Sequence, residues 1–445
     1  MAGLRVAQLL GPGVILLEAR PSPGGRVRSV YEKNGSLAYE AGPWRVGSSH
    51  ERVRALCREL QVDLTPAPTP PLRKKKRASP TIPGLSTWDV HALHSSSAAE
   101  ADAADLETGY ADQTHSASGS APYEVAKGST FFVAPTGLQA FVDRLAEAAT
   151  EAGADLRWNH MVQDVRERTD GRYDVHVRVR DGHNSFRSQT LSCDDLFLCL
   201  PPGACRAWTA LQNHARCVLS SVEPGELHHI YSRGDERVPR GLHVSKNDLL
   251  GQTVSSQYPL SPWFQASYSG GRVARFWHNL FLAHPKIVPD VLQGLLKRPV
   301  KDLRSHFWPV AFHRWRPVPG FDLNSSVRKA VRANSVKLPG VYIAGEAFSS
   351  HQAWMEGSLE TAELAVRACV LDRRRGKSAV SGKLRDRSVV FVEGRTIPVK
   401  EWQSVHPGGA APLQNHLGED VTELMRQMDH SDHAWAVAFS LSRIL

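Results

Sequence analysis

The sequence lacks several features that would place it in whole classes of protein. No run of about 18 consecutive apolar residues occurs, so no transmembrane helix is expected. The first ten residues lack the basic, apolar and small-residue order of a secretory signal peptide. Only six cysteines occur in 445 residues, none in a C-x-x-C pair, which argues against a disulfide framework and a cysteine-based zinc site. We therefore expect a cytoplasmic protein without a membrane span.

The formal charge of +9 is concentrated in two segments of the chain. A basic run at 73–77 lies within a stretch rich in proline, serine and alanine, 66–122, which has too few apolar residues to fold and is expected to be a disordered insert. A second segment, 371–387, holds seven basic and two acidic residues and is expected to be a linker. No nucleic-acid partner is expected from charge of this kind, although the run 73–77 also fits a nuclear-targeting signal.

The change of charge after residue 387 marks a domain boundary. Residues 388–445 contain seven acidic and four basic side chains, a net charge of −3. Upstream, the apolar spacing predicts alternating helices and strands, which favours an α/β fold. The helices are expected at 2–10, 51–60 and 137–152, and the strands at 14–18, 173–179, 196–200 and 341–344.

The N-terminal segment has the second half of a dinucleotide-binding pattern. Gly3 opens a helix, a short apolar strand follows, and Glu18 ends that strand. In such folds a carboxylate at this place binds the adenosine ribose, and Gly3 takes the position of the third glycine. The first strand and the first two glycines would then precede Met1, so we expect tight cofactor binding to need residues upstream of it. This half-pattern alone fits any β-α-β unit.

The sequence that follows is more specific. The segments Glu18-Ala19-Arg20, Gly24-Gly25-Arg26 and Gly42-Pro43-Trp44-Arg45, with 341–346 and 352–362 near the end, resemble the flavin-containing amine oxidases, including L-amino-acid oxidases. The resemblance covers roughly 1–65 and 125–370. It implies a discontinuous, Rossmann-like FAD-binding domain (1–65, 123–205 with substrate-domain segments, and 325–370) and an α+β substrate domain (206–324). The cofactor residues it implies are Gly3, Glu18, Arg20, Gly24, Gly25, Arg26, Gly42, Pro43, Trp44, Arg45, Val162, Gly345, Glu346, Trp354 and Met355.

The same resemblance suggests how a substrate would be held. Trp354 matches one wall of the family's aromatic cage, and Arg45 matches the arginine that holds the substrate carboxylate in amino-acid oxidases. A core tryptophan and a flavin-binding arginine are the alternatives. No cysteine lies between Asp302 and Val341, where some members attach flavin covalently, so we expect noncovalent FAD. Many members also have a lysine that supports reaction with oxygen. The segment 227–233, which we align with the strand that carries this lysine, has none.

The C-terminal segment resembles a second family. His406-Pro407-Gly408-Gly409, then 418–422, then His430-Ser431 resemble cytochrome b5 domains, in which the two histidines bind haem iron from opposite sides. The resemblance implies a small α+β module at 388–445 that binds haem b through His406 and His430.

We thus expect an FAD-dependent oxidoreductase that converts a primary amine or L-amino acid to an imine. The electrons would pass to O2 or to the fused haem, and an external reductase or electron acceptor is the other expected partner. Two alternatives stay open: a desaturase-like flavoprotein acting on C–C bonds, and a non-catalytic flavoprotein scaffold or haem carrier.

Overall fold

A computed structural model describes most of the chain outside the expected insert and linker. The residues described are 1–10, 13–67, 82–86, 89–90, 93, 130–182, 185–212, 215–234, 242–244, 249–254, 258, 261–316, 322–332, 338–378, 389–392, 395–403, 406, 411–417, 419, 421–428, 430 and 438. The basic run 73–77 and most of the insert 66–122 lie outside them. Among the described helices, none has both the length and the apolar character needed to cross a membrane.

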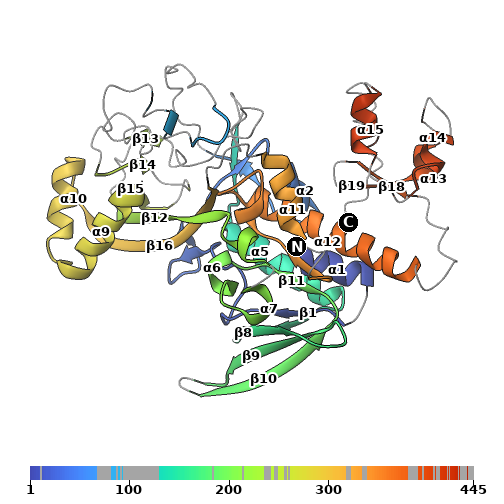
Figure 1. The fold of residues 1–445 in the computed structure, drawn as a ribbon. Helices are drawn as coiled ribbons and strands as arrows, with labels where there is room; N and C mark the ends of the chain where they lie inside the picture. The colour runs from blue at the N-terminus through green and yellow to red at the C-terminus, as the bar shows by residue number, and fades with distance from the viewer. Residues whose placement is uncertain are drawn as a thin grey trace.

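The part of the chain that carries the dinucleotide pattern contains short parallel strand pairs packed against helices (Figure 1). Helix α1 (Ala2–Leu10) leads into β1 (Ile15–Leu17), which pairs in parallel with β7 (Asp155–Arg157). Farther along the chain, β11 (Leu196–Leu198) pairs in parallel with β17 (Val341–Ile343). The structure thus mixes helix and strand, as expected for an α/β protein. The parallel strands form two separate pairs, so no continuous doubly wound sheet is seen among the described residues.

Gly3 lies where α1 packs closely on β1. A Cβ atom at this position would come within 2.3 Å of Leu16 Cδ2, so a larger residue would force the leucine to move. Close packing of helix on strand is the task of the third glycine in a dinucleotide-binding turn. The contact supports the position that the sequence pattern gives to Gly3.

Helix α12 (Met355–Ser378) links the elements around the pocket described below. It packs on α1, on β17 and on α2 (Glu51–Glu59). Glu356 in its first turn accepts hydrogen bonds from the backbone N–H groups of Arg52 and Val53, both at 3.0 Å, and so caps the N-terminus of α2. The helix also continues eight residues into the range 371–387 that we assigned to the linker, so the helical part ends at Ser378.

A three-stranded antiparallel sheet and several short elements complete the part of the chain that surrounds the parallel strand pairs. The sheet has the order β10 (Phe186–Cys193), β9 (Tyr173–Arg180) and β8 (His160–Glu167), and alternate residues of β9 are buried, as period-two spacing predicts. The remaining elements are β2 (Ser29–Tyr31), β3 (Leu37–Glu40), β4 (Val46–Gly47), β5 (Thr65–Pro66), β6 (Phe131–Val133), α5 (Leu138–Glu151), α6 (Pro202–Cys205), α7 (Thr209–Gln212), α8 (Arg216–Leu219), α11 (Leu323–Val331) and the 3-10 helix η1 (Glu346–Phe348).

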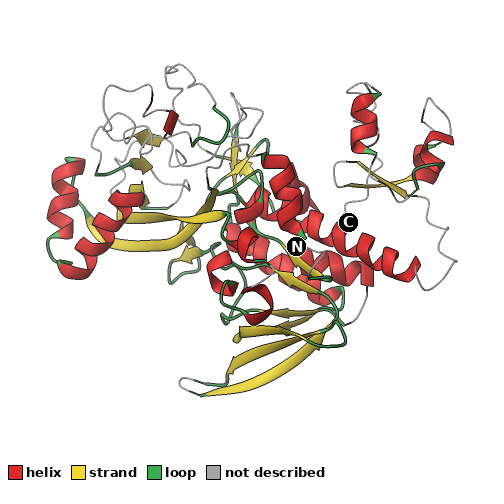
Figure 2. Ribbon diagram, viewed as in Figure 1, coloured by secondary structure: helices red, strands yellow, loops and turns green. Residues whose placement is uncertain are grey.

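The expected substrate domain is a five-stranded antiparallel sheet. Its order is β13 (Leu242–Val244), β14 (Gln252–Val254), β15 (Trp263–Gly270), β12 (Val222–Arg233) and β16 (Lys301–Trp315). Helices α9 (Gly271–Ala283) and α10 (Val288–Leu296) pack on it (Figure 2). Ile230 and Phe264 are buried against them. Because side chains alternate along a strand, the neighbouring His229 and Gln265 point to the opposite face.

The C-terminal module has its own small core. Strands β18 (Val389–Val392) and β19 (Arg395–Pro398) form an antiparallel pair, followed by α13 (Val399–Trp402), α14 (Ala411–Gln414) and α15 (Thr422–Gln427). This core contains Val390, Val392, Ile397, Val399, Trp402, Leu413, Val421, Met425 and Ala438. This mixture of strands and helices agrees with the α+β module expected from the sequence.

Candidate functional site

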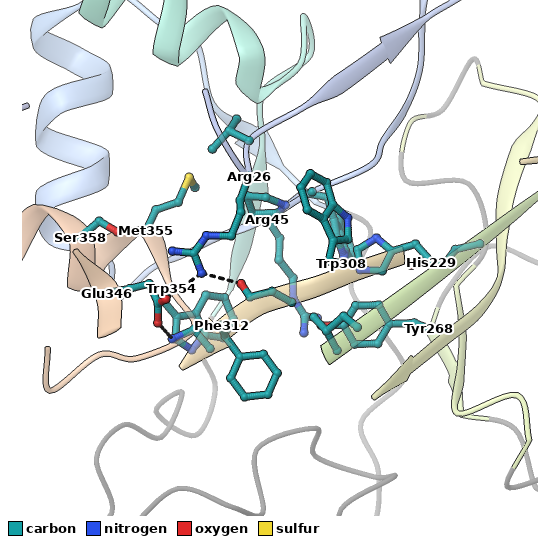
Figure 3. Close-up of a pocket in the computed structure, with 18 of the residues that line it drawn as sticks. Arg26, Arg45, His229, Tyr268, Trp308, Phe312, Glu346, Trp354, Met355 and Ser358 are labelled. Atoms are coloured by element: carbon teal, nitrogen blue, oxygen red, sulfur yellow. Dashed lines mark hydrogen bonds and ion pairs between the residues drawn. The ribbon is translucent and has the colours of Figure 1, made fainter. Parts of the chain in front are cut away.

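A cavity of about 230 Å³ lies between the glycine-rich turn, the start of α12 and the five-stranded sheet. Nine of the cofactor residues expected from the sequence line it: Gly24, Arg26, Gly42, Pro43, Trp44, Arg45, Glu346, Trp354 and Met355. Residues from four strands of the sheet complete the wall: Leu227, His229, Gln252, Val254, Gln265, Tyr268, Trp308, Ala311 and Phe312. In Figure 3, Glu346, Trp354 and Met355 lie on one side of the cavity, and His229 and Tyr268 lie on the other. The fold thus brings chain segments more than 300 residues apart to one pocket.

The other expected cofactor residues do not line this cavity: Gly345 follows β17, whereas Glu18, Arg20 and Val162 lie near the end of β1. Glu18 follows the strand directly, and its carboxylate accepts a hydrogen bond from the backbone N–H of Arg20 at 2.9 Å. The Arg20 guanidinium donates to the carbonyl of Gly25 at 2.8 Å, which connects this corner to the glycine-rich turn. Val162 on β8 packs in the same apolar cluster as Leu17. This grouping fits the place where the resemblance puts the ribose and adenine of FAD.

The glycine-rich turn has a backbone that favours glycine at two successive positions. Gly24 has φ +120° and Gly25 has φ +57°, and a Cβ atom on Gly24 would come within 2.6 Å of the Val27 carbonyl. The turn is closed by the N–H of Val27, which donates to the Gly24 carbonyl at 2.9 Å. This turn places the Arg26 side chain in the cavity wall.

Glu346 organises the wall around Arg26. Its carboxylate accepts hydrogen bonds from Arg26 Nη1 and His313 Nδ1, both at 2.7 Å, and from the backbone N–H groups of His313 (3.2 Å) and Ala353 (3.1 Å). Burial alone would raise the pKa of Glu346, but the Arg26 charge and the His313 hydrogen bond outweigh it and lower the pKa to about 2. With four donors already in place, the carboxylate holds Arg26 and the turn before α12.

The Arg45 guanidinium contacts two aromatic rings. It stands 4.5 Å from the ring centre of Phe131 and 5.2 Å from that of Trp44. Within the part of the chain that the structure describes, no carboxylate forms an ion pair with it. A half-buried guanidinium held by rings and lacking a carboxylate partner is suited to bind an anionic group of a ligand.

The Trp354 ring packs against a histidine, and Trp354 directly precedes α12. His50, fully buried, packs edge-on against it with ring centres 4.7 Å apart. Burial lowers the pKa of His50 to about 4, so this imidazole is neutral near pH 7. The next residue, Met355, is the first of α12, and it also lines the cavity. The positive end of the helix dipole therefore points toward the cavity, where a reduced flavin would carry negative charge.

The sheet side of the cavity contains residues that the sequence reasoning did not assign to a site. No lysine lines the cavity among the described residues, and Leu227 and His229 occupy the wall contributed by β12. Burial lowers the pKa of His229 to about 3, so this side chain is neutral as well. The alternation of β12 and β15 could have identified an inward face, but it gives no indication of which polar residues of that face meet a ligand.

The two histidines expected to bind haem iron face each other in the C-terminal module. The centres of the His406 and His430 rings lie 6.1 Å apart, and the ring planes are at 27°. Two imidazoles bound to one iron at about 2.0–2.1 Å per bond would have ring centres on the order of 6 Å apart. His430 Nδ1 lies 3.2 Å from the Met425 carbonyl, so Nδ1 is the donor in this contact and Nε2 is the nitrogen that would bind the iron. The pair therefore fits a haem with two axial histidines.

Comparison with protein-family models gives two matches. Residues 1–81 and 91–370 match the flavin containing amine oxidoreductase model, and residues 380–442 match the cytochrome b5-like heme/steroid binding domain model. A comparison with curated proteins gave no match. The first family implies FAD as cofactor and the second implies haem, in agreement with the two sites described above. The chain belongs to the flavin-containing amine oxidoreductases, and it has a cytochrome b5-like domain at its C-terminal end.

Proposed function

We propose that this oxidoreductase converts the C–N bond of a small primary amine or L-amino acid to an imine and passes the electrons to its own haem domain. The observation that carries the substrate part is the cavity wall itself: Arg45, without a carboxylate partner among the described residues, and Trp354 line the same cavity as the glycine-rich turn. FAD, when bound, supplies the acceptor for the two electrons that leave the amine carbon.

The residues of this chain would position the substrate and keep water away. Arg45 would bind the carboxylate of an amino acid, which fixes the substrate at one end. Trp354, held by His50, forms an apolar wall that shields the reacting carbon from water. Glu346 is the only carboxylate that lines the cavity among the described residues, and it is neutralised by Arg26. A cavity of this kind favours anionic or neutral substrates over polycationic amines.

Three observations support the haem as electron acceptor. The histidine pair has the spacing of axial ligands. No lysine lines the described cavity in the way expected of an oxygen-using member. The haem domain also contacts the helix that begins at the cavity, since the Arg367 guanidinium of α12 lies 4.7 Å from the ring centre of Phe391. Oxidation of an amine releases two electrons, and haem iron accepts one at a time, so each turnover requires two transfers.

Product analysis tests the proposal. The full chain, loaded with FAD and haem, is incubated with a panel of L-amino acids and the matching decarboxylated amines, with ferricyanide as final electron acceptor. We expect stoichiometric release of ammonia and a carbonyl compound, which are the hydrolysis products of an imine. Arg45→Lys is a matched variant that keeps the charge but not the planar, two-pronged donor. Formation of a C=C bond with the amine retained would instead identify a desaturase, and no turnover of any amine would contradict the proposal.

A further inference from the structure

The sheet side of the cavity has buried polar atoms that bind nothing within the protein. Gln265 is fully buried and lines the cavity, and neither its Nε2 nor its Oε1 has a hydrogen-bond partner. His229 is 3% exposed, lines the same cavity, and its Nε2 also lacks a partner. Leaving a buried donor or acceptor unpaired is costly, so unpaired atoms on residues that line a cavity indicate that a ligand pairs them.

The hydrogen-bond network determines which nitrogen of His229 accepts. Tyr231 donates its only hydroxyl proton to the Glu40 carbonyl at 2.5 Å. The same hydroxyl oxygen lies 3.5 Å from His229 Nδ1, so in this long contact Nδ1 is the donor. Nε2 of the neutral ring is then a lone-pair acceptor. The ring is held in place by Tyr268, its neighbour across the strands, with ring centres 4.9 Å apart.

We propose that His229 and Gln265 form a substrate-recognition subsite for a neutral primary carboxamide. The subsite offers two acceptors, His229 Nε2 and Gln265 Oε1, and one donor group, Gln265 Nε2. A primary carboxamide has the complementary set, because its NH2 group donates twice and its oxygen accepts. If the oxygen and nitrogen of the Gln265 side chain exchange places, the numbers of donors and acceptors in the subsite stay the same.

Other ligand classes leave part of the subsite unpaired. A carboxylate accepts only, so it would face the lone pairs of His229 and Gln265 without a proton to share. An ammonium donates only, and among the described lining residues the sole carboxylate, Glu346, is already paired with Arg26. An apolar side chain pairs none of the three groups. We therefore expect the chain to prefer amines or amino acids that end in a carboxamide, a preference that rests on the proposed function for the amine end of the substrate.

Two measurements on the full chain with bound FAD and haem test the subsite. The first is equilibrium binding of butanamide, butanoate and 2-pentanone, followed by the perturbation of the flavin spectrum, which requires no turnover. The second is the anaerobic rate of flavin reduction by L-glutamine, L-glutamate, L-lysine and L-norleucine as a function of concentration. We expect butanamide and L-glutamine to bind roughly 10–100-fold more tightly than the other members of their series.

Variants distinguish a loss of ligand recognition at the subsite from a loss of FAD binding or of the fold. Gln265→Leu should remove the preference for butanamide and L-glutamine, and the isosteric Gln265→Glu should move it toward L-lysine. Ser269→Ala is the matched control, because Ser269 lies on the same strand with an unpaired hydroxyl but does not line the cavity. Equal binding across each series would overturn the subsite, as would a Gln265→Leu variant with altered FAD content or resting flavin spectrum. A preference for butanamide without flavin reduction by any amino acid or primary amine would support the subsite and contradict the proposed function.

Discussion

Replacing Glu346 by glutamine should weaken the fold around the cavity in a pH-dependent way. The carboxylate is 4% exposed and accepts four hydrogen bonds, two of them from the Arg26 and His313 side chains. A pKa lowered from 4.5 to about 2 corresponds to a stabilisation on the order of 3 kcal/mol at neutral pH. Because Arg26 is 31% exposed and water can partly replace its partner, we expect a loss of about 2–3 kcal/mol in Glu346→Gln.

The pH dependence follows from the direction of the shift. The folded-state pKa of Glu346 lies below its ordinary value of 4.5, so the stabilisation is present above pH 4.5 and is lost as the pH falls toward 2. Urea unfolding, followed by tryptophan fluorescence at several pH values, should show the parent and variant converging below pH 4.5. Asp170→Asn, in a pair with Arg168 that is 44% exposed on both sides, should leave the unfolding curve unchanged. A Glu346→Gln variant as stable as the parent at pH 7, or one whose deficit grows below pH 4.5, would refute this reasoning.

Three further predictions concern other parts of the molecule. Arg45→Met should raise KM for L-amino acids roughly 10–200-fold and leave KM for the decarboxylated amines nearly unchanged in steady-state assays; equal losses would assign Arg45 to the flavin or the fold. His430→Ala should abolish the haem absorbance while FAD content stays constant, whereas His416→Ala, on an exposed side chain paired with Glu419, should retain haem. Burial raises the pKa of Glu40 to about 7, so its contribution to stability is present below pH 4.5 and lost as the pH rises through 7; Glu40→Gln should flatten that decline in urea-unfolding curves.

The parts of the site that were predicted from the sequence are those encoded by short, local patterns. The glycine-rich turn before Arg26 and the helix start at Met355 require particular residues at fixed spacing, because backbone geometry near the cofactor allows few substitutes. The structure places both at the cavity, together with Arg45 and Trp354. His406 and His430 are similar, since haem iron with two axial imidazoles needs two histidines, and these two face each other at the required separation.

The parts that were not predicted depend on long-range contacts. His229 and Gln265 lie on ordinary alternating strands, and only the pairing of β12 with β15 and the meeting of this sheet with the segment 24–45 bring both to the cavity. The role of Glu346 depends on Arg26, which is 320 residues away in the chain. The end of α12 at Ser378 was missed because a run of basic residues has no apolar periodicity, although arginine and lysine are good helix formers.

Anaerobic stopped-flow spectroscopy of the full chain, mixed with an amine or amino-acid substrate, tests most directly whether amine oxidation is coupled to the haem. Flavin and haem absorbance are recorded together at several protein concentrations, with His430→Ala as the control that lacks a ligand to the iron. We expect flavin reduction first and haem reduction second, with a rate constant for haem that does not change with protein concentration. Haem that stays oxidised while the flavin is bleached, or haem reduction that scales with protein concentration, would contradict electron transfer within one chain.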